Sequence, residues 1–273
     1  MQPRLIEVTT TVEQAAAALR QGYAAEHLYA LRVGMRRIRS MLKPLVSTRP
    51  RRFRKTWGGF AAVTNSARDW DVFLRAAAEL LPPEQYARFE QRHRDTVRAS
   101  HEAVLELLES AHWRRNLGDW RHYLEQHGAD ASQPQAGPAP IDHALSGARQ
   151  ALATAQATGE DRAWHKLRIA VKEVRYQSEA SAVGAEPEPP QAELIELCKP
   201  LQALLGSWHD CVVQLQLLDD MEPSPEHEAL RAAIGRLRAE QLALIEQAVA
   251  GHSLFAAPDP DQTHSRSSSV SGS

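Results

Sequence analysis

The sequence predicts an all-α fold. The chain of 273 residues is 43% hydrophobic and 24% charged, which is usual for a globular protein. Its abundant Ala, Leu, Glu, Arg and Gln favour helix, and no convincing stretch alternates β-branched and polar residues as a half-buried strand does. Apolar residues recur instead at helical spacing, in two segments that align with each other. These features predict amphipathic helices packed around a sizeable core.

Cysteine content and the N-terminal segment predict a cytoplasmic location. Cys198 and Cys211 are the only cysteines, too few for a disulfide framework, and this favours a reducing compartment. The first residues lack the basic and apolar pattern of a signal peptide, and no apolar run is long enough to cross a bilayer. We therefore expect no membrane association.

The first helical half is expected over residues 8–128, and it concentrates positive charge. The segment LRVGMRRIRSMLKP, residues 31–44, places five basic side chains on one expected helix. No Asp or Glu occurs from His27 to Arg68, although the chain carries a formal net charge of −2 and its pI is about 6.6. Such a basic block predicts an anionic partner, while the acidic remainder argues against a protein that coats DNA indiscriminately.

A linker and a second helical half follow. The Pro- and Gly-rich stretch GADASQPQAGPAP predicts a linker over residues 129–140. The second half is expected over residues 141–255, with a helix break at GAEPEPP, residues 184–190. The polar tail, residues 256–273, has little to bury and is expected to be disordered.

The two halves contain an internal repeat. LYALRVGMRRIRS, residues 28–40, aligns with WHKLRIAVKEVRY, residues 164–176, and each has an apolar stripe at helical spacing. The basic positions of these segments also align: Arg32, Arg36 and Arg39 with Arg168, Lys172 and Arg175. Their spacing of i, i+4 and i+7 puts each basic row on one helix face, beside the buried stripe.

A second pair of motifs follows at a comparable distance. NSARDWDV, residues 65–72, aligns with GSWHDCVV, residues 206–213. Arg68 and Asp69 thereby align with His209 and Asp210. In both motifs a Ser precedes an acid by three residues, which fits a capping box and would place Arg68 and His209 in the first turn of a helix. The same residues could also lie in the middle of a helix.

The two motif pairs, in this order, resemble the CHAD family, the conserved histidine α-helical domain. The resemblance spans roughly residues 8–252. It implies two four-helix bundles related by a pseudo-twofold axis, which form a central basic groove that binds inorganic polyphosphate without catalysis. It implies no cofactor, and it is compatible with a role at polyphosphate or storage granules.

The resemblance and the basic block together imply a set of polyphosphate contacts from both halves. They are Arg32, Arg36, Arg37, Arg39, Lys43, Arg54, Lys55, Arg68, His165, Arg168, Lys172, Arg175, Lys199 and His209. One departure from the family pattern is Tyr29, which stands where the second half has the family histidine, His165. Glu173 also stands opposite Arg37, so we expect an asymmetric site with more positive charge from the first half.

The sequence leaves two other functions open. A metal-dependent phosphohydrolase would need converging ligands, for which the candidates are His165, His209, Asp69, Asp71 and Asp210. No tight metal-binding spacing and no P-loop is present in the sequence. An RNA-binding module could stack bases on Trp57 and Phe60 within the basic block. The acidic pI and the lack of a nucleic-acid motif count against RNA, so nucleic acid is not an expected partner.

Overall fold

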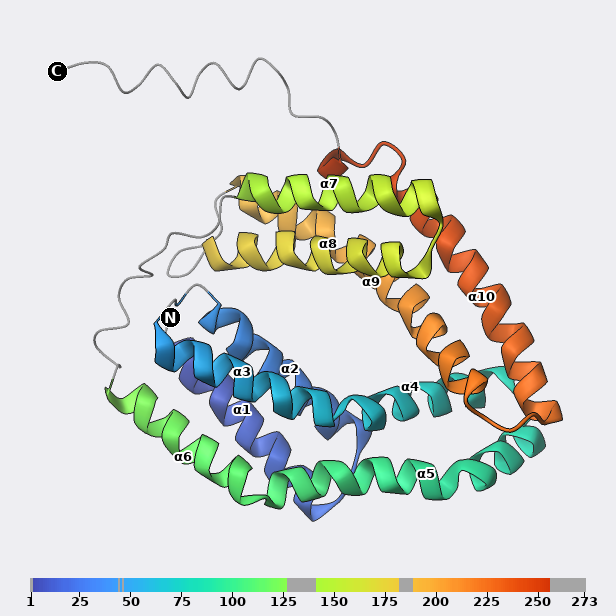
Figure 1. Ribbon diagram of the computed structural model, residues 1–273, viewed down its shortest axis with the longest axis horizontal. Helices are drawn as coiled ribbons and strands as arrows, with labels where there is room; N and C mark the ends of the chain where they lie inside the picture. Colours follow the sequence, from blue (N-terminus) through green and yellow to red (C-terminus); the bar gives the residue numbers. More distant parts are fainter. Residues whose placement is uncertain (1, 44, 46, 127–140, 182–188, 256–273) are drawn as a thin grey trace.

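The computed structural model describes residues 2–43, 45, 47–126, 141–181 and 189–255. Within these ranges the chain forms ten α-helices, one short 3-10 helix and no β-strand, which confirms the all-α class (Figure 1). The predicted linker at 129–140, the predicted tail at 256–273 and most of the predicted break at 184–190 lie outside the described residues.

The helices follow one another in two series. The first comprises α1 (Gln2–Gln21), α2 (Ala25–Leu42), α3 (Thr48–Val63), α4 (Asn65–Leu80), α5 (Pro83–Glu109) and α6 (Ala111–Gln126). The second comprises α7 (Ile141–Thr158), α8 (Asp161–Ser181), α9 (Pro189–Asp219), α10 (Pro225–Val249) and the 3-10 helix η1 (Ser253–Phe255). The repeated basic segments fall inside α2 and α8, as their spacing predicted.

The repeat extends through the next helix of each half. The helix that is continuous as α9 is divided into α3 and α4 in the first half, with Thr64 at the division. Core positions keep one register across the two halves: Trp57, Phe60, Ala67 and Trp70 correspond to Cys198, Leu201, Trp208 and Cys211, and all are buried. A single alignment therefore relates α3 and α4 to α9 position by position.

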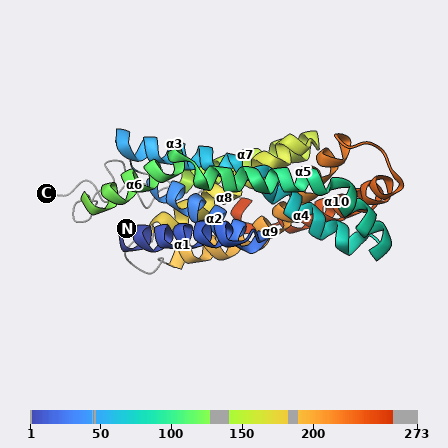
Figure 2. The same ribbon diagram turned by 90° about the horizontal axis from the view of Figure 1, so that it is seen from below.

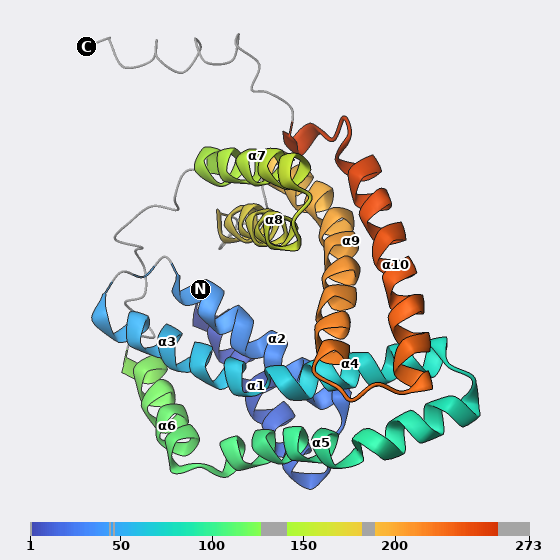
Figure 3. The same cartoon turned by 45° about the vertical axis from the view of Figure 1, so that its right-hand side comes forward.

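Three hydrophobic cores hold the helices together. The first joins α1, α2, α3, the start of α4, α6 and the C-terminal part of α5 around Trp57, Trp113 and Trp120. The second joins α7, α8, η1 and parts of α9 and α10 around Trp164 and Trp208. The third is shared between the halves, because α4 and the start of α5 pack against the end of α9 and the start of α10 (Figure 3). The shared core fixes the two halves against each other.

Helix α2 lies unusually close to α1. A Cβ atom on Gly34 would come within 2.4 Å of Cγ2 of Val12, a distance that side chains do not adopt. Gly34 therefore permits the approach that seats the basic row of α2. Figure 2 shows α1 and α2 side by side from a second direction.

The capping-box prediction is wrong in both halves. In the first half a helix does begin at this point and Arg68 lies in its first turn, as expected. Its N-cap, however, is Thr64 and not Ser66, and it makes no side-chain capping bond. The Thr64 hydroxyl instead donates to the carbonyl oxygen of Ala61 at 2.8 Å. In the second half, Ser207 lies in the middle of α9, which runs on without a break. Asp69 and Asp210 have a different role, described below.

Two further features are the state of the cysteines and the apolar character of the helices. Cys198 and Cys211 are free thiols buried in the cores. In the part of the chain that the structure describes, no helix has the length and apolar character needed to cross a membrane.

Candidate functional site

Basic side chains from both halves converge where α2 and α4 meet α8 and α9. The first half contributes Arg32, Arg36 and Arg68, and the second contributes Arg168 and Lys172. Arg36 and Arg68 lie close enough to Arg168 for their positive charges to act on it across the boundary between the halves. We call these five side chains the cationic cluster.

Burial and mutual repulsion act together on the cluster. Burial lowers the pKa of Lys172 to about 8, and repulsion from Arg168 and Arg36 adds to the effect. The pKa of Arg168 is also lowered, chiefly by burial, although the nearby Asp210 partly offsets this. Burial likewise lowers the pKa of Arg32, with repulsion from Arg68 as the next cause. These cations are held together at an electrostatic cost.

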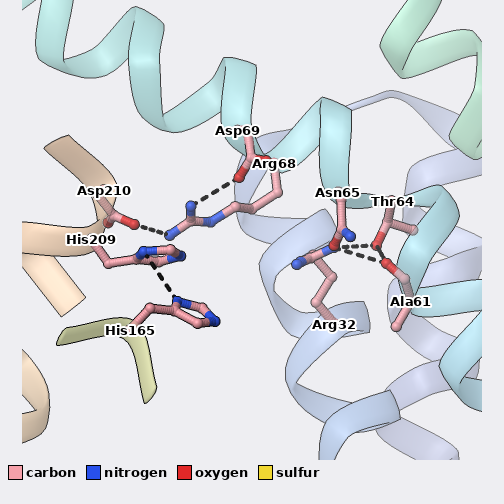
Figure 4. A network of polar contacts seen from close by, with 9 residues as sticks. All are labelled: Arg32, Ala61, Thr64, Asn65, Arg68, Asp69, His165, His209 and Asp210. Atoms are coloured by element: carbon pink, nitrogen blue, oxygen red, sulfur yellow. Dashed lines mark hydrogen bonds and ion pairs between the residues drawn. The ribbon is translucent and has the colours of Figure 1, made fainter. Parts of the chain in front are cut away.

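Among the described residues, carboxylates form ion pairs with only one member of the cluster, Arg68. The Arg68 guanidinium donates to Asp210 on α9 at 2.8 Å and to Asp69 on its own helix at 3.0 Å (Figure 4). Burial alone would lower the pKa of Arg68, but Asp210 and Asp69 outweigh it and the pKa is raised. Among the described residues, no carboxylate forms an ion pair with Arg36, Arg168 or Lys172. The cluster therefore retains uncompensated positive charge.

Arg32 holds the division between α3 and α4. Its Nη1 donates to the Ala61 carbonyl at 3.1 Å and to Asn65 Oδ1 at 3.0 Å, and it also contacts the Thr64 hydroxyl (Figure 4). These acceptors lie at the end of α3 and the start of α4, where backbone groups lack helical partners. Arg32 is thus both a member of the cluster and a structural clamp, which its place in a basic row did not reveal.

Two histidines border the cluster on the second half. Nδ1 of His165 lies 3.4 Å from Nδ1 of His209, so one ring must donate and the other accept (Figure 4). Burial, followed by repulsion from Arg168, lowers the pKa of both rings, that of His209 to about 4. Both are therefore neutral at pH 7. In the first half Tyr29 is 69% exposed, so it does not repeat the contact that His165 makes.

A hollow beside the cluster lies between α2 and α3. It has a volume of about 330 Å³ and is lined by Arg32, Arg36, Arg39, Gly58, Ala61, Ala62 and Asn65. The Arg39 guanidinium lies across Gly58, where an added Cβ would be 3.4 Å from Nε of Arg39. Arg39, one of the predicted contacts, is therefore part of the candidate site as a residue that lines this hollow.

The other predicted contacts have separate places. Lys43, the C-cap residue of α2, forms an ion pair with Glu173 on α8. Arg175 pairs with Glu179 on its own helix at 3.2 Å. Lys199 pairs with Glu196 one turn away on α9. Within the described residues, the structure gives no contact between the cluster and Arg37, Arg54 or Lys55, which lie on α2 and α3.

The carboxylates and aromatic side chains named for the two alternative functions have other partners. Asp71 accepts hydrogen bonds from Tyr23 at 2.8 Å and from His101 at 3.0 Å, and both Asp69 and Asp210 bind Arg68. In the described ranges, no three His, Cys, Asp or Glu side chains come together as metal ligands would. Trp57 and Phe60 are buried in the first core, so they cannot stack on RNA bases as that hypothesis required.

Comparison with known proteins identifies relatives of this fold. The family model of the CHAD domain matches residues 5–219. The crystal structure of the CHAD domain from the plant Ricinus communis is 20% identical, with a TM-score of 0.69 over 93% of this chain and 90% of that one. PptA from Streptomyces chartreusis is 19% identical, with a TM-score of 0.58 over 92% of this chain and 94% of that one. At these identities the structural likeness shows the fold. No curated protein matches the sequence.

Proposed function

This chain belongs to the CHAD domain family, and we propose that it binds inorganic polyphosphate at the cationic cluster without hydrolysing it. The uncompensated charge of the cluster carries this proposal. Burying a cation without a partner is costly, and an anion that enters the site repays that cost. We assign three side chains to the phosphates: Arg168 and Lys172, which are partly buried, and Arg36, which is exposed beside them. None of the three forms an ion pair with a carboxylate among the described residues.

Polyphosphate suits this arrangement because of its charge and its lack of bases. Each phosphate unit carries about one negative charge, and guanidinium groups bind phosphate oxygens through paired, charge-assisted hydrogen bonds. Cations on helices from both halves would bind successive phosphate units of one polyphosphate chain. Such binding releases counterions, so affinity should fall steeply with rising salt.

The remaining members of the site would support these contacts. Arg68 joins α4 to α9 through Asp69 and Asp210, and Arg32 fixes the α3–α4 division. Both are positioning residues whose charge also adds to the local field. The neutral pair of His165 and His209 can donate a ring N–H to a phosphate oxygen. A cytoplasmic role at polyphosphate or storage granules would follow from such binding, with no cofactor and no catalytic residue.

An assay of binding and turnover tests the proposal against the alternatives. Purified protein is mixed with long-chain polyphosphate, with and without Mg²⁺ or Mn²⁺, while bound polymer and released phosphate are both measured. We expect retention of the polymer without metal and no release of phosphate with it. Metal-dependent release would establish a hydrolase instead. RNA that displaces polyphosphate at equal phosphate concentration and fixed salt would establish nucleic-acid binding.

A further inference from the structure

We propose that bound polyphosphate leaves the cationic cluster on one side only, through the hollow between α2 and α3, which we call the α2–α3 groove. We further propose that this groove gives the protein a preference for long polyphosphate chains. The inference rests on the proposed function, because it assigns a path to the same ligand. It divides the site into a central part that any short polyphosphate can fill and an extension that only a longer chain can reach.

The groove opens directly from the cluster. Arg32 and Arg36 belong to the cluster and also line the hollow of about 330 Å³ between α2 and α3. Three small residues on α3, Gly58, Ala61 and Ala62, line it too, so no long side chain from that helix fills it. The Arg39 guanidinium lies across Gly58 and adds a third cation. A phosphate chain that leaves the cluster therefore meets open space lined by arginines.

Positive charge continues beyond the hollow along α3. Arg54 lies four residues before Gly58, which puts it on the same helix face one turn further from the cluster. Arg51 and Lys55 are exposed on neighbouring positions of the helix. Within the described residues, none of the three forms an ion pair with a carboxylate. A polyphosphate chain too long for the cluster would therefore meet further cations along α3.

The corresponding region of the second half is built differently. In the register set by the buried residues, Gly58, Ala61 and Ala62 correspond to Lys199, Gln202 and Ala203 on α9. The Gln202 amide donates to the Val171 carbonyl on α8 at 3.4 Å, so it lies across the space between the two helices. Two of the three small residues that line the hollow in the first half are therefore replaced by larger ones, Lys199 and Gln202.

The charge of the second-half region is also reversed. The segment RRFRK, residues 51–55, corresponds to AELIE, residues 192–196, which replaces four basic residues with two acids. Lys43 corresponds to Glu179, which pairs with Arg175. Glu196 pairs with Lys199 and Glu179 pairs with Arg175, so a polyanion that extended along α8 and α9 would meet no excess of positive charge there. Both halves thus contribute to the cluster, but further unpaired cations for a longer polyphosphate chain lie along the first half.

Two matched substitutions test this path. Ala62 and Ala203 hold the same repeat position, and both are exposed on helices. Ala62→Glu places a carboxylate in the groove, and Ala203→Glu places one at the counterpart on α9. Binding of tripolyphosphate and of long-chain polyphosphate is measured for each variant and for the unmodified protein. Ala62→Gln controls for side-chain size without charge, and circular dichroism verifies the fold.

We expect Ala62→Glu to weaken long-chain binding about five- to tenfold while tripolyphosphate binding changes less than about twofold. Ala203→Glu should leave both ligands within about twofold of the unmodified protein. Equal losses from the two variants, or none from Ala62→Glu, would overturn the one-sided path. So would equal affinity of the unmodified protein for the two ligands. An unmodified protein that binds neither ligand would refute the proposed function itself.

Discussion

The two halves of this protein share a scaffold and differ in what they present on it. Helices α3 and α4 keep the buried register of α9, so the alignment of core positions is unbroken. The positions between these core residues have diverged. The first half has Arg68 and the segment RRFRK, where the second half has His209 and the segment AELIE. A repeat can therefore preserve its core while one copy carries most of the positive charge. The structure thereby explains how an acidic chain builds a local cationic site.

The largest predicted effect distinguishes ligand contacts from structural ones. Arg36→Gln combined with Lys172→Gln should lower polyphosphate affinity by at least about a hundredfold, because each of the two charge-assisted contacts contributes about 1.5 to 3 kcal/mol. The variant should unfold at the same temperature as the unmodified protein or a higher one, because repulsion within the cluster falls. Calorimetric titration and thermal unfolding measure the two properties.

Arg68→Gln is the matched control for that variant. Its loss leaves Asp69 and Asp210 without their partner, so stability should fall by about 1 to 3 kcal/mol together with the affinity. If the variant at Arg36 and Lys172 were instead the one that unfolds, these cations would be structural and the distinction between the two sets would be wrong.

The second prediction concerns pH and the second half's contribution to the cluster. The pKa of Lys172 is lowered to about 8, chiefly by burial, and a bound polyanion would raise it. Below pH 8 the ammonium is charged in the free and the bound protein, so Lys172 adds no pH dependence. Above pH 8 the free protein loses this proton while the bound one keeps it, so affinity should decline by up to about tenfold per pH unit.

A conservative variant sharpens this pH test. Lys172→Arg keeps its charge throughout the range, because a guanidinium stays protonated in proteins. Titrations between pH 7 and 10 should therefore show a flatter profile for the variant than for the unmodified protein. Profiles that decline in parallel would mean that another group titrates in this range.

A smaller effect is expected where the halves differ in helix packing. Gly34→Ala places a Cβ against Val12 and should cost about 1 to 3 kcal/mol of folding free energy. In the second half, the corresponding position in α8 already carries a Cβ, as Ala170. Gly59→Ala is the control, since nothing lies within 4 Å of its added Cβ and the helix should gain up to about 1 kcal/mol. Chemical denaturation measures both. Equal changes would show that α1 and α2 tolerate wider spacing.

The smallest predicted effect lies in the core that the halves share. Nε2 of His93 on α5 is 2.8 Å from Nε2 of His227 on α10, and both rings are buried. Burial lowers the pKa of both, that of His93 to about 4, with His227 as the next cause for His93. The unfolded chain binds protons near pH 6.5 and the folded one does not, so stability is full above that pH and is lost as the pH falls toward 4.

Replacement of one histidine tests this acid sensitivity. His93→Gln should reduce the drop in unfolding temperature between pH 7 and pH 5, because it removes one of the two groups that must gain a proton. An unchanged drop would assign the acid sensitivity to other histidines, such as His165 and His209, whose pKa values are also lowered by burial.

The all-α fold and the basic rows at the centre of the candidate site could be predicted from the sequence, because both depend on periodic patterns. Apolar positions at helical spacing placed the repeated segments within α2 and α8, and the basic rows beside them included Arg36, Arg168 and Lys172. Those patterns repeat every turn, so they can be read without knowing how the helices pack.

Features that depend on tertiary contacts were not predictable in this way. The clamp formed by Arg32, the use of Asp210 by Arg68 and the pairing of Lys43 with Glu173 all join residues far apart in the sequence. The capping-box motif misled because a local pattern cannot tell a helix start from the interior of a longer helix such as α9. Trp57 lies within a basic block, but its position on the apolar stripe of α3 places it in the core.

Calorimetric titration with long-chain polyphosphate at two salt concentrations, without added metal, tests the central claim most directly. The uncompensated cluster predicts tight binding whose affinity falls steeply as salt rises, through release of counterions. Absence of binding at low salt would contradict the account and leave the converging cations without the ligand proposed for them.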